Sequence, residues 1–312
     1  MEGSRHWLMR HRFRRFWFWL ACLAYCACAW VPLTTLPAAA QPTDWDCPSS
    51  ITRGEESEAT PLPVSTPVVE FPVEGGGLTV FAAASLTDAF EAIESELESA
   101  TPDLSITYSF GGSQALVTQL TEGAEADVFA SANVAQMEAA IEAGLIAGDA
   151  ATFARNRLAI VMPRDNPAGI ESAADLGKEG TLLVLAQAEV PAGQYAREAV
   201  CQMASDTATY GSDFVRRVAA NVVSEEEDVR DVLTKVTLGE VDAGIVYVSD
   251  AAAAGEQVQV VDIPDEVNII ATYPIAVLAE GDQALGSAFV AYLLSDEGQA
   301  ILERFGFQPV DQ

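Results

Sequence analysis

From residue 78 onward, the chain alternates short apolar runs with segments in which apolar residues recur at helical spacing. Leu78 to Ala83 is typical of a buried strand, and one helical face follows it with Leu86, Phe90, Ile93 and Leu97. Further apolar runs of strand length occupy 104–108, 127–129, 158–162, 181–186, 244–248 and 258–263. Strands that alternate with helices predict an α/β fold with mostly parallel sheets flanked by helices.

The stretch from residue 78 to residue 312 is longer than one hydrophobic core usually supports, so we expect it to form two lobes. In open α/β sheets, ligands bind beyond the carboxyl ends of the strands. Functional residues are therefore expected where a strand ends and the next helix begins.

The first forty residues differ from the rest of the chain. Their basic part contains Arg5, Arg10, Arg12, Arg14 and Arg15. An apolar run from Phe16 to Trp30 and the small residues Ala38 to Ala40 follow, which is the order of a secretory signal with cleavage after Ala40. Because the run from Phe16 to Leu36 is nearly long enough to stay as a membrane anchor, the sequence leaves open whether residues 1–40 are cleaved, lipidated or retained.

Residues 41–77 are rich in proline and acids and end in three glycines, a composition typical of a flexible linker. Beyond the leader only Cys47 and Cys201 remain, too few for a disulfide framework and without the spacing of metal ligands. These two cysteines can pair or stay free, and the sequence leaves both outcomes open.

The chain is strongly acidic, with 46 Asp and Glu against 16 Lys and Arg and a formal net charge of −30. We therefore expect neither nucleic acid nor anionic lipid as a partner. Such acidity is typical of a solvated surface that keeps an exported protein soluble, and it gives no help in binding an anion.

The first strand-to-helix junction carries Ser85, with Asp88 three residues later. This Ser-x-x-Asp order is a capping-box arrangement, in which the serine hydrogen-bonds its own helix. In the alternative interpretation, the hydroxyl and the free amides behind it face an anion. For this motif in isolation, the cap is the favoured interpretation.

The second junction places Ser113 after Gly111 and Gly112, at the start of a helix that carries Leu116 and Leu120. The glycines let the backbone approach a ligand closely, whereas a tight turn with an N-cap is the structural alternative. Two serine-opened helices at successive strand ends would direct the positive ends of their dipoles at one cleft, which favours an anion site.

Three later junctions offer backbone amides and one phenol. Pro191, Ala192 and Gly193 mark a strand end before a helix. Acidic residues around Asp228 open another helix, where acids favour the N-terminus. Tyr247 ends a buried strand, where a tyrosine is more often a core residue whose hydroxyl is already hydrogen-bonded.

Several kinds of chemistry lack their residues. Both histidines, His6 and His11, belong to the leader, so histidine-dependent catalysis and histidine metal sites are excluded for the chain after residue 40. The chain has no G-x-x-x-x-G-K phosphate loop, and residues 111–115 lack the glycine after Ser113 that a nucleophile elbow requires. A paired-carboxylate enzyme stays open as an alternative, since acids are plentiful, but no acid stands out from the surface pattern. We expect no cofactor and no enzyme activity.

Taken together and in chain order, the junctions resemble the periplasmic molybdate-binding protein family, the receptor subunits of ABC transporters that import molybdate. The resemblance spans Leu78 to Phe307 and rests on FAAASL at 81–86, VPAG at 190–193, EDVR at 227–230 and GIVY at 244–247. It implies a two-lobed periplasmic-binding-protein-like fold of type II, with the ligand in the cleft between the lobes. Lobe 1 would comprise 78–157 and 274–312, and lobe 2 would comprise 158–273.

Carried over residue by residue, the resemblance implies an oxyanion site built from seven neutral hydrogen-bond donors. These would be the hydroxyl and amide of Ser85, the hydroxyl and amide of Ser113, the amides of Ala192 and Val229, and the hydroxyl of Tyr247. The two serines would belong to one lobe and the other residues to the second. The sequence departs from related ones before Ser113, where Gly111 and Gly112 stand in place of small hydroxyl residues.

The resemblance further implies molybdate or tungstate as the ligand and the membrane permease of an ABC transporter as the partner of a monomeric receptor. It also implies export to the periplasm or to the outer face of the cell membrane. Molybdate and tungstate have nearly the same size and charge, so the sequence does not separate them. A sulfate or other oxyanion receptor is the alternative in the same class, and an enzyme or a ligand sensor on the same scaffold is the alternative outside it.

Overall fold

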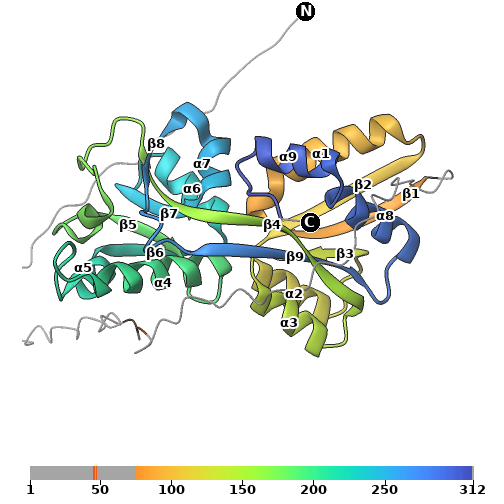
Figure 1. Ribbon diagram of the computed structural model, residues 1–312, viewed down its shortest axis with the longest axis horizontal. Coiled ribbons are helices and arrows are strands. Elements are labelled where there is room, and N and C mark those ends of the chain that lie inside the picture. The colour runs from red at the N-terminus through yellow and green to blue at the C-terminus, as the bar shows by residue number, and fades with distance from the viewer. Residues whose placement is uncertain (1–44, 46, 48–74, 311–312) are drawn as a thin grey trace, which may run out of the picture. The chain divides into compact units, whose positions relative to one another are not determined.

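A computed structural model describes residues 45, 47 and 75–310 (Figure 1). The predicted leader and most of the predicted linker lie outside the described residues. Two sheets share one long strand, β4 (Ile146–Pro163). In the first sheet the strands run in the order β2 (Leu104–Gly111), β1 (Gly76–Ala83), β3 (Val128–Ala130), β9 (Ile270–Leu278) and β4.

The second sheet continues from β4 to β7 (Ala243–Tyr247), β5 (Leu183–Ala186) and β6 (Val222–Glu226), while β8 (Val258–Asp262) also pairs with β4. Strand β4 pairs with β9 up to Arg157 and with β7 from Leu158 onward. It therefore crosses from one sheet to the other, as Figure 1 shows at the centre of the molecule. We call the first sheet with its helices the first lobe, and the second sheet with its helices the second lobe.

The fold class predicted from the sequence is confirmed, but the sheets are mixed and not mostly parallel. Strand β1 is parallel to β2 and β3, and β5 is parallel to β6 and β7. Every antiparallel pairing among the described strands involves β4 or β9. The reason is that these two strands connect the lobes: β9 runs against the parallel strands of the first sheet, and β4 runs against those of the second. The lobe limits given above stay a prediction.

Helices cover both sheets (Figure 1). Those of the first lobe are α1 (Thr87–Ala100), α2 (Ser113–Thr121), α3 (Val134–Glu142), α8 (Gln283–Leu293) and α9 (Asp296–Arg304). Those of the second are α4 (Pro191–Ser205), α5 (Phe214–Asn221), α6 (Val229–Thr237) and α7 (Val248–Ala254). Three short 3₁₀ turns are η1 (Ala84–Leu86), η2 (Ala173–Gly177) and η3 (Gly255–Gln257). Within the described ranges, no helix combines the length and apolar character needed to cross a membrane.

The hydrophobic periodicity of the sequence locates the core where the structure has it. Helix α1 buries Phe90, Ile93 and Leu97 on the predicted face, and Val80 to Ala83 of β1 are buried as expected of a central strand. Strand β1 begins two residues earlier than expected. Buried apolar side chains of this kind contribute about 1.5–3 kcal/mol each to folding, so they fix the orientation of the strand ends that follow.

The chain before β1 is attached to the second lobe. Cys47 and Cys201 form a disulfide with a Cα–Cα distance of 5.6 Å, which answers the question that the sequence left open. The Arg197 guanidinium lies 5.4 Å from the centre of the Trp45 ring, within the range of a cation–π contact. Because Arg197 and Cys201 both belong to α4, the predicted linker is held against that helix at this point.

We expect the disulfide to stabilise the protein. It closes a long loop, with a sequence separation of 154, and so restricts the unfolded chain. The double substitution Cys47→Ser and Cys201→Ser should lower the free energy of unfolding by about 2–4 kcal/mol, measured by denaturant unfolding. Reduced wild-type protein is the control and should match the variant, whereas equal stability of the oxidised wild type and the variant would contradict this role.

Candidate oxyanion-binding site

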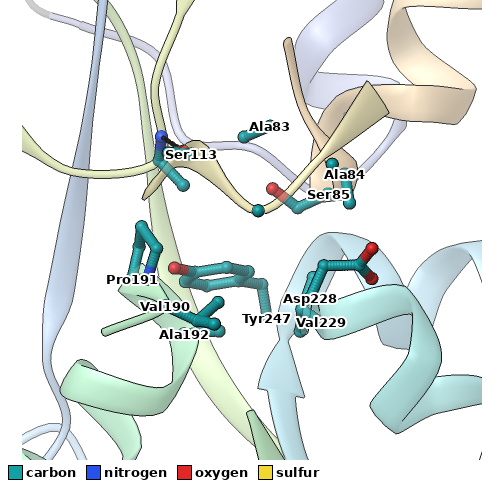
Figure 2. Close-up of a pocket in the computed structure, with 13 residues that line it drawn as sticks. Ala83, Ala84, Ser85, Ser113, Val190, Pro191, Ala192, Asp228, Val229 and Tyr247 are labelled. Atoms are coloured by element: carbon teal, nitrogen blue, oxygen red, sulfur yellow. Dashed lines mark hydrogen bonds between the residues drawn. The ribbon is translucent and has the colours of Figure 1, made fainter. Parts of the chain in front are cut away.

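A small pocket lies between the two lobes, lined by 13 residues that come from both of them (Figure 2). The first lobe contributes residues from the ends of β1 and β2, and the second contributes the starts of α4 and α6 and the end of β7. The cavity is small, about 10 Å³. It therefore has no room for a sugar or a peptide.

The five residues predicted from the sequence all line this pocket: Ser85, Ser113, Ala192, Val229 and Tyr247. Each is at most 4% exposed. In Figure 2 the two serines lie on one side of the pocket, and Ala192, Val229 and the Tyr247 ring lie on the other. The residues come from five separate elements, so the fold and not their sequence spacing brings them together.

Neither serine caps its helix, so the capping interpretation of both junctions is wrong. Ser85 lies in the turn η1 before α1, and Ser113 is the first residue of α2, whose N-cap is Gly112. The Ser85 Oγ lies 2.9 Å from the Tyr273 Oη, and the Ser113 Oγ accepts the backbone N–H of Ala132 at 3.0 Å. Because the Ser113 oxygen already accepts that amide, its proton is free to be donated into the pocket.

Three helices begin at the pocket. Ser113 and Val229 are the first residues of α2 and α6, and Ala192 is the second residue of α4, after Pro191. Amides in the first turn of a helix have no acceptor within that helix, and the helix dipole makes this end positive. These three N–H groups are therefore available to an anion.

The two lobes approach each other closely at Gly112. A Cβ on this residue would lie 2.6 Å from the carbonyl oxygen of Glu227 in the second lobe. The neighbouring Gln114 side chain donates to that same carbonyl at 3.0 Å. Gly112 therefore permits close contact between the lobes. From the sequence, the glycine was expected to permit a close approach of the backbone to the ligand.

Tyr247 is fully buried, and in Figure 2 its hydroxyl points into the pocket. Within the described part of the chain this hydroxyl makes no hydrogen bond of regular geometry. Burial raises the pKa of Tyr247 well above its ordinary value, and the charge of the nearby Tyr273 acts in the same direction. The hydroxyl therefore keeps its proton. Its contact with the Tyr273 hydroxyl lies outside regular hydrogen-bond geometry, which makes Tyr247 a candidate ligand donor and not the satisfied core residue that its strand suggested.

No lysine or arginine is among the described residues that line the pocket, and Asp228 is the one ionisable acid among them. Its carboxylate accepts the backbone N–H groups of Arg230 at 2.8 Å and Asp231 at 3.1 Å, so it caps α6 as expected. Figure 2 shows this carboxylate directed away from the Tyr247 hydroxyl. The groups that face the pocket are therefore neutral donors.

A cation lies just outside the pocket and joins the lobes. Arg230 forms an ion pair with Asp88 of α1 in the first lobe, and its Nε lies 2.9 Å from the Asp250 Oδ1 in the second. A weaker contact joins the lobes on another side, where the Asn133 Nδ2 lies 3.4 Å from the Gln194 Oε1. Together with the bond from Gln114 to Glu227, these contacts hold the lobes closed around the pocket.

The positions of three residues at the site were not predicted from the sequence. Tyr273 lies behind Ser85 on β9, a strand that the sequence did not predict. Arg230 belongs to a motif that carried the resemblance, but its link between lobes depends on partners from two other elements. The cap on α6 made by Asp228 was expected, whereas its place in the pocket lining was not.

Comparison with known proteins agrees with this geometry. Residues 78–308 match the family of bacterial extracellular solute-binding proteins. The chain belongs to this family. This bacterial extracellular solute-binding protein is 41% identical over 247 residues to the molybdate-binding protein ModA of Mycobacterium tuberculosis, an alignment that covers 78% of this chain and 89% of that relative.

Solved structures share the fold of this solute-binding protein. The periplasmic molybdate-binding protein of Azotobacter vinelandii matches with a TM-score of 0.64 and 17% identity, over 75% of this chain and all of that structure (100%). The sulfate-binding protein SubI of Mycobacterium tuberculosis matches with a TM-score of 0.67 and 20% identity, over 76% of this chain and 88% of that one. At these identities the two structures support the two-lobed fold alone.

The ion pair between Arg230 and Asp250 leads to a pH prediction. Burial raises the pKa of Asp250 to about 6, although Arg230 and the Tyr247 amide both act to lower it. A carboxyl whose pKa is higher in the folded state than in the unfolded state stabilises the fold below the unfolded pKa, and this contribution is lost as the pH rises through the folded value. Compared with the Asp250→Asn variant, the wild type should therefore lose stability between about pH 4 and pH 6.

Denaturant unfolding of both proteins across this pH range measures the difference. The Asp282→Asn variant is a matched control, because Asp282 caps α8 away from the pocket. A constant difference between the wild type and Asp250→Asn from pH 4 to pH 6 would show that Asp250 does not titrate in this window.

Proposed function

We propose that this solute-binding protein captures molybdate or tungstate outside the cell and delivers it to the membrane permease of an ABC importer. The observation that carries the proposal is that neutral hydrogen-bond donors from both lobes meet in one buried pocket without a cation among its described lining residues. The molybdate-binding function of the Mycobacterium tuberculosis relative supports the choice of ligand.

The physical requirement for such a ligand is a large number of donors. A dianion that leaves water loses hydration worth tens of kcal/mol in the idealised limit, so nearly every oxygen needs hydrogen bonds in the pocket. Hydrogen bonds to a charged group contribute about 1.5–3 kcal/mol each. About seven donors, from Ser85, Ser113, Ala192, Val229 and Tyr247, are then enough for micromolar to nanomolar affinity.

A pocket of donors selects against ligands that carry a proton. Monohydrogen phosphate would leave its own O–H without an acceptor, and this unpaired donor disfavours binding. Sulfate carries no proton, so only the size of the cavity discriminates against it. For this reason a sulfate receptor is the second candidate function.

The remaining features of the proposal concern partners and location. Closure of the two lobes on the ligand provides the signal that the permease recognises. We propose a monomer that performs no catalysis, as expected of a member of a solute-binding family. The formal net charge of −30 disfavours nucleic acid as a partner. No cluster of three or more metal-ligating residues occurs in the described ranges, so molybdenum would be bound as the oxyanion through its oxygens.

Calorimetric titration with molybdate, tungstate, sulfate and phosphate tests the proposed function. We expect strong binding of the first two, weaker binding of sulfate and no binding of phosphate. Absence of heat with molybdate and tungstate would remove the proposal, and tighter binding of sulfate would transfer it to the second candidate.

Single donors in the pocket can be removed one at a time. Ser85→Ala and Tyr247→Phe each remove one hydroxyl donor to a buried charge, so each should weaken molybdate binding by about 1–3 kcal/mol in the same titration. Tyr108→Phe is the matched control, because the Tyr108 hydroxyl donates to the Phe90 carbonyl at 2.9 Å outside the pocket. Wild-type affinity in both Ser85→Ala and Tyr247→Phe would show that the site lies elsewhere.

The ion pair between lobes makes a separate prediction about closure. Asp88→Asn removes the first-lobe partner of Arg230 and leaves the pair with Asp250 intact. Because both side chains of the lost pair are partly exposed, we expect molybdate affinity to fall by only about twofold to fivefold. The loss should come from faster dissociation of molybdate. Stopped-flow measurement of release checks this.

The control for this measurement is Glu91→Gln, which makes the same charge change at an exposed position of α1. An unchanged dissociation rate in Asp88→Asn, or an equal change in Glu91→Gln, would contradict the role of the ion pair in closure.

A further inference from the structure

The Arg197 side chain lies behind the start of α4 and is largely buried. Only 13% of it is exposed, and it is not among the described residues that line the pocket. The proposed function does not use it. A charged side chain that is this buried is expected to be paired and hydrogen-bonded, so its partners indicate its role.

One guanidinium nitrogen joins the end of a strand to the start of a helix. The Arg197 Nη1 donates to the Ala186 carbonyl at the end of β5 and to the Gly193 carbonyl in the first turn of α4, both at 2.8 Å. The Nη2 forms an ion pair with Glu225 of β6. Two carbonyl oxygens that share a donor lie close together, and their negative ends would repel each other without it. Arg197 therefore holds α4 against the end of β5.

The first turn of α4 is packed tightly on this strand end. A Cβ at Gly193 would lie 1.9 Å from the Gln187 carbonyl oxygen and 2.4 Å from that of Ala186, so the backbones touch directly. Ala192 precedes Gly193 and lies at the pocket in Figure 2, where its amide is one of the proposed donors. Hydrogen bonds weaken steeply when the donor points away from the acceptor, so a shift of this turn would weaken the bond from that amide.

The chain before β1 packs on Arg197. The Trp45 ring centre lies 5.4 Å from the guanidinium, and the disulfide between Cys47 and Cys201 fixes this segment to the next turn of α4. An aromatic face attracts a guanidinium and keeps water away from it, and hydrogen bonds of a charged group are stronger where water is excluded. Trp45 therefore helps to keep Arg197 on its two carbonyls.

We propose that Arg197 is a positioning residue, which together with Trp45 fixes the first turn of α4 so that the Ala192 amide is directed at the oxyanion. The inference rests on the proposed function and deepens it, because it names the support of one donor. It also gives the segment before β1 a part in ligand affinity. Arg197 acts through the direction of its hydrogen bonds and not through its charge, which is paired with Glu225.

Substitutions of Arg197 test this role. Arg197→Met removes the guanidinium and keeps an apolar chain of similar length. We expect molybdate affinity to fall at least about fivefold in calorimetric titration, since the bond from one amide to a buried charge is weakened. Arg197→Lys keeps the charge but lacks the planar fork that reaches both carbonyls and Glu225, so its affinity should fall as well.

Arg217→Met is the matched control in the same lobe. The Arg217 guanidinium also donates to two carbonyls, those of Gly177 at 2.8 Å and Tyr210 at 2.6 Å. It pairs with Asp213 and lies against the Phe214 ring. None of these residues is among the described residues that line the pocket, so Arg217→Met should keep the wild-type molybdate affinity even where it lowers stability.

The Ala192 amide itself gives the readout that separates positioning from a loss of stability. In the wild type, we expect the proton resonances of the Ala192 and Val229 amides to move when molybdate is added, measured by two-dimensional NMR of isotope-labelled protein. In Arg197→Met saturated with molybdate, the displacement should shrink at Ala192 and stay unchanged at Val229, because Arg197 contacts the start of α4 alone among these two helix starts.

A second variant keeps the inference testable if Arg197→Met fails to fold. Trp45→Leu leaves every residue of α4 in place and removes only the aromatic face over the guanidinium. We expect molybdate affinity to fall about twofold to fivefold, the range that corresponds to a cation–π contact, with the same selective change at the Ala192 amide.

The outcomes separate the inference from the proposed function. If the wild type binds no oxyanion, the proposed function fails and the inference fails with it. If the wild type binds molybdate, the inference alone is overturned by wild-type affinity in Arg197→Met or Trp45→Leu, or by equal changes at the Ala192 and Val229 amides. Wild-type affinity in Arg197→Lys would overturn it too, because the charge of residue 197 would then be sufficient.

Discussion

The structure of this binding site depends on the hydration of an anion. A doubly charged ligand enters a closed pocket only if the protein replaces the hydrogen bonds that water provided. In the proposed site the replacements are neutral: first-turn amides of α2, α4 and α6 and the hydroxyls of Ser85, Ser113 and Tyr247, which all lie at the pocket. Because the amides belong to the first turns of helices, their directions within each lobe are set before the ligand arrives, which lowers the cost of binding.

The same requirement explains features outside the pocket. Donors from two lobes act together only when the lobes are closed, and the contacts of Arg230 with Asp88 and Asp250 favour that state without bringing a cation into the pocket. The acid nearest the site, Asp228, directs its charge to helix amides. The positive charge of Arg230 thus contributes to closure of the lobes. The proposed recognition of the ligand relies on neutral groups whose hydrogen bonds have a direction.

Much of the fold and the site could be predicted because the relevant residues follow strand ends in chain order. The strands β6 and β9 were not predicted from the sequence, and the reasons are physical. Pro274 lies inside β9 next to a register shift, and a proline within a run argues against a strand when only the sequence is known. Strand β6 lies at the edge of its sheet and tolerates the acids Glu225 and Glu226. The contact of Tyr273 with Ser85 could not be predicted either, because the two residues are 188 positions apart and only the fold brings them together.

We propose that a dianion is bound here by hydroxyls and amides alone, with no cationic side chain in contact. The most direct measurement is a crystal structure of the protein with molybdate, in which the anomalous signal of molybdenum locates the ion. We expect the ion between Ser85, Ser113 and Tyr247, with the Ala192 and Val229 amides within hydrogen-bond distance. An ion bound elsewhere, or one held by Arg230 or another cationic side chain, would contradict it.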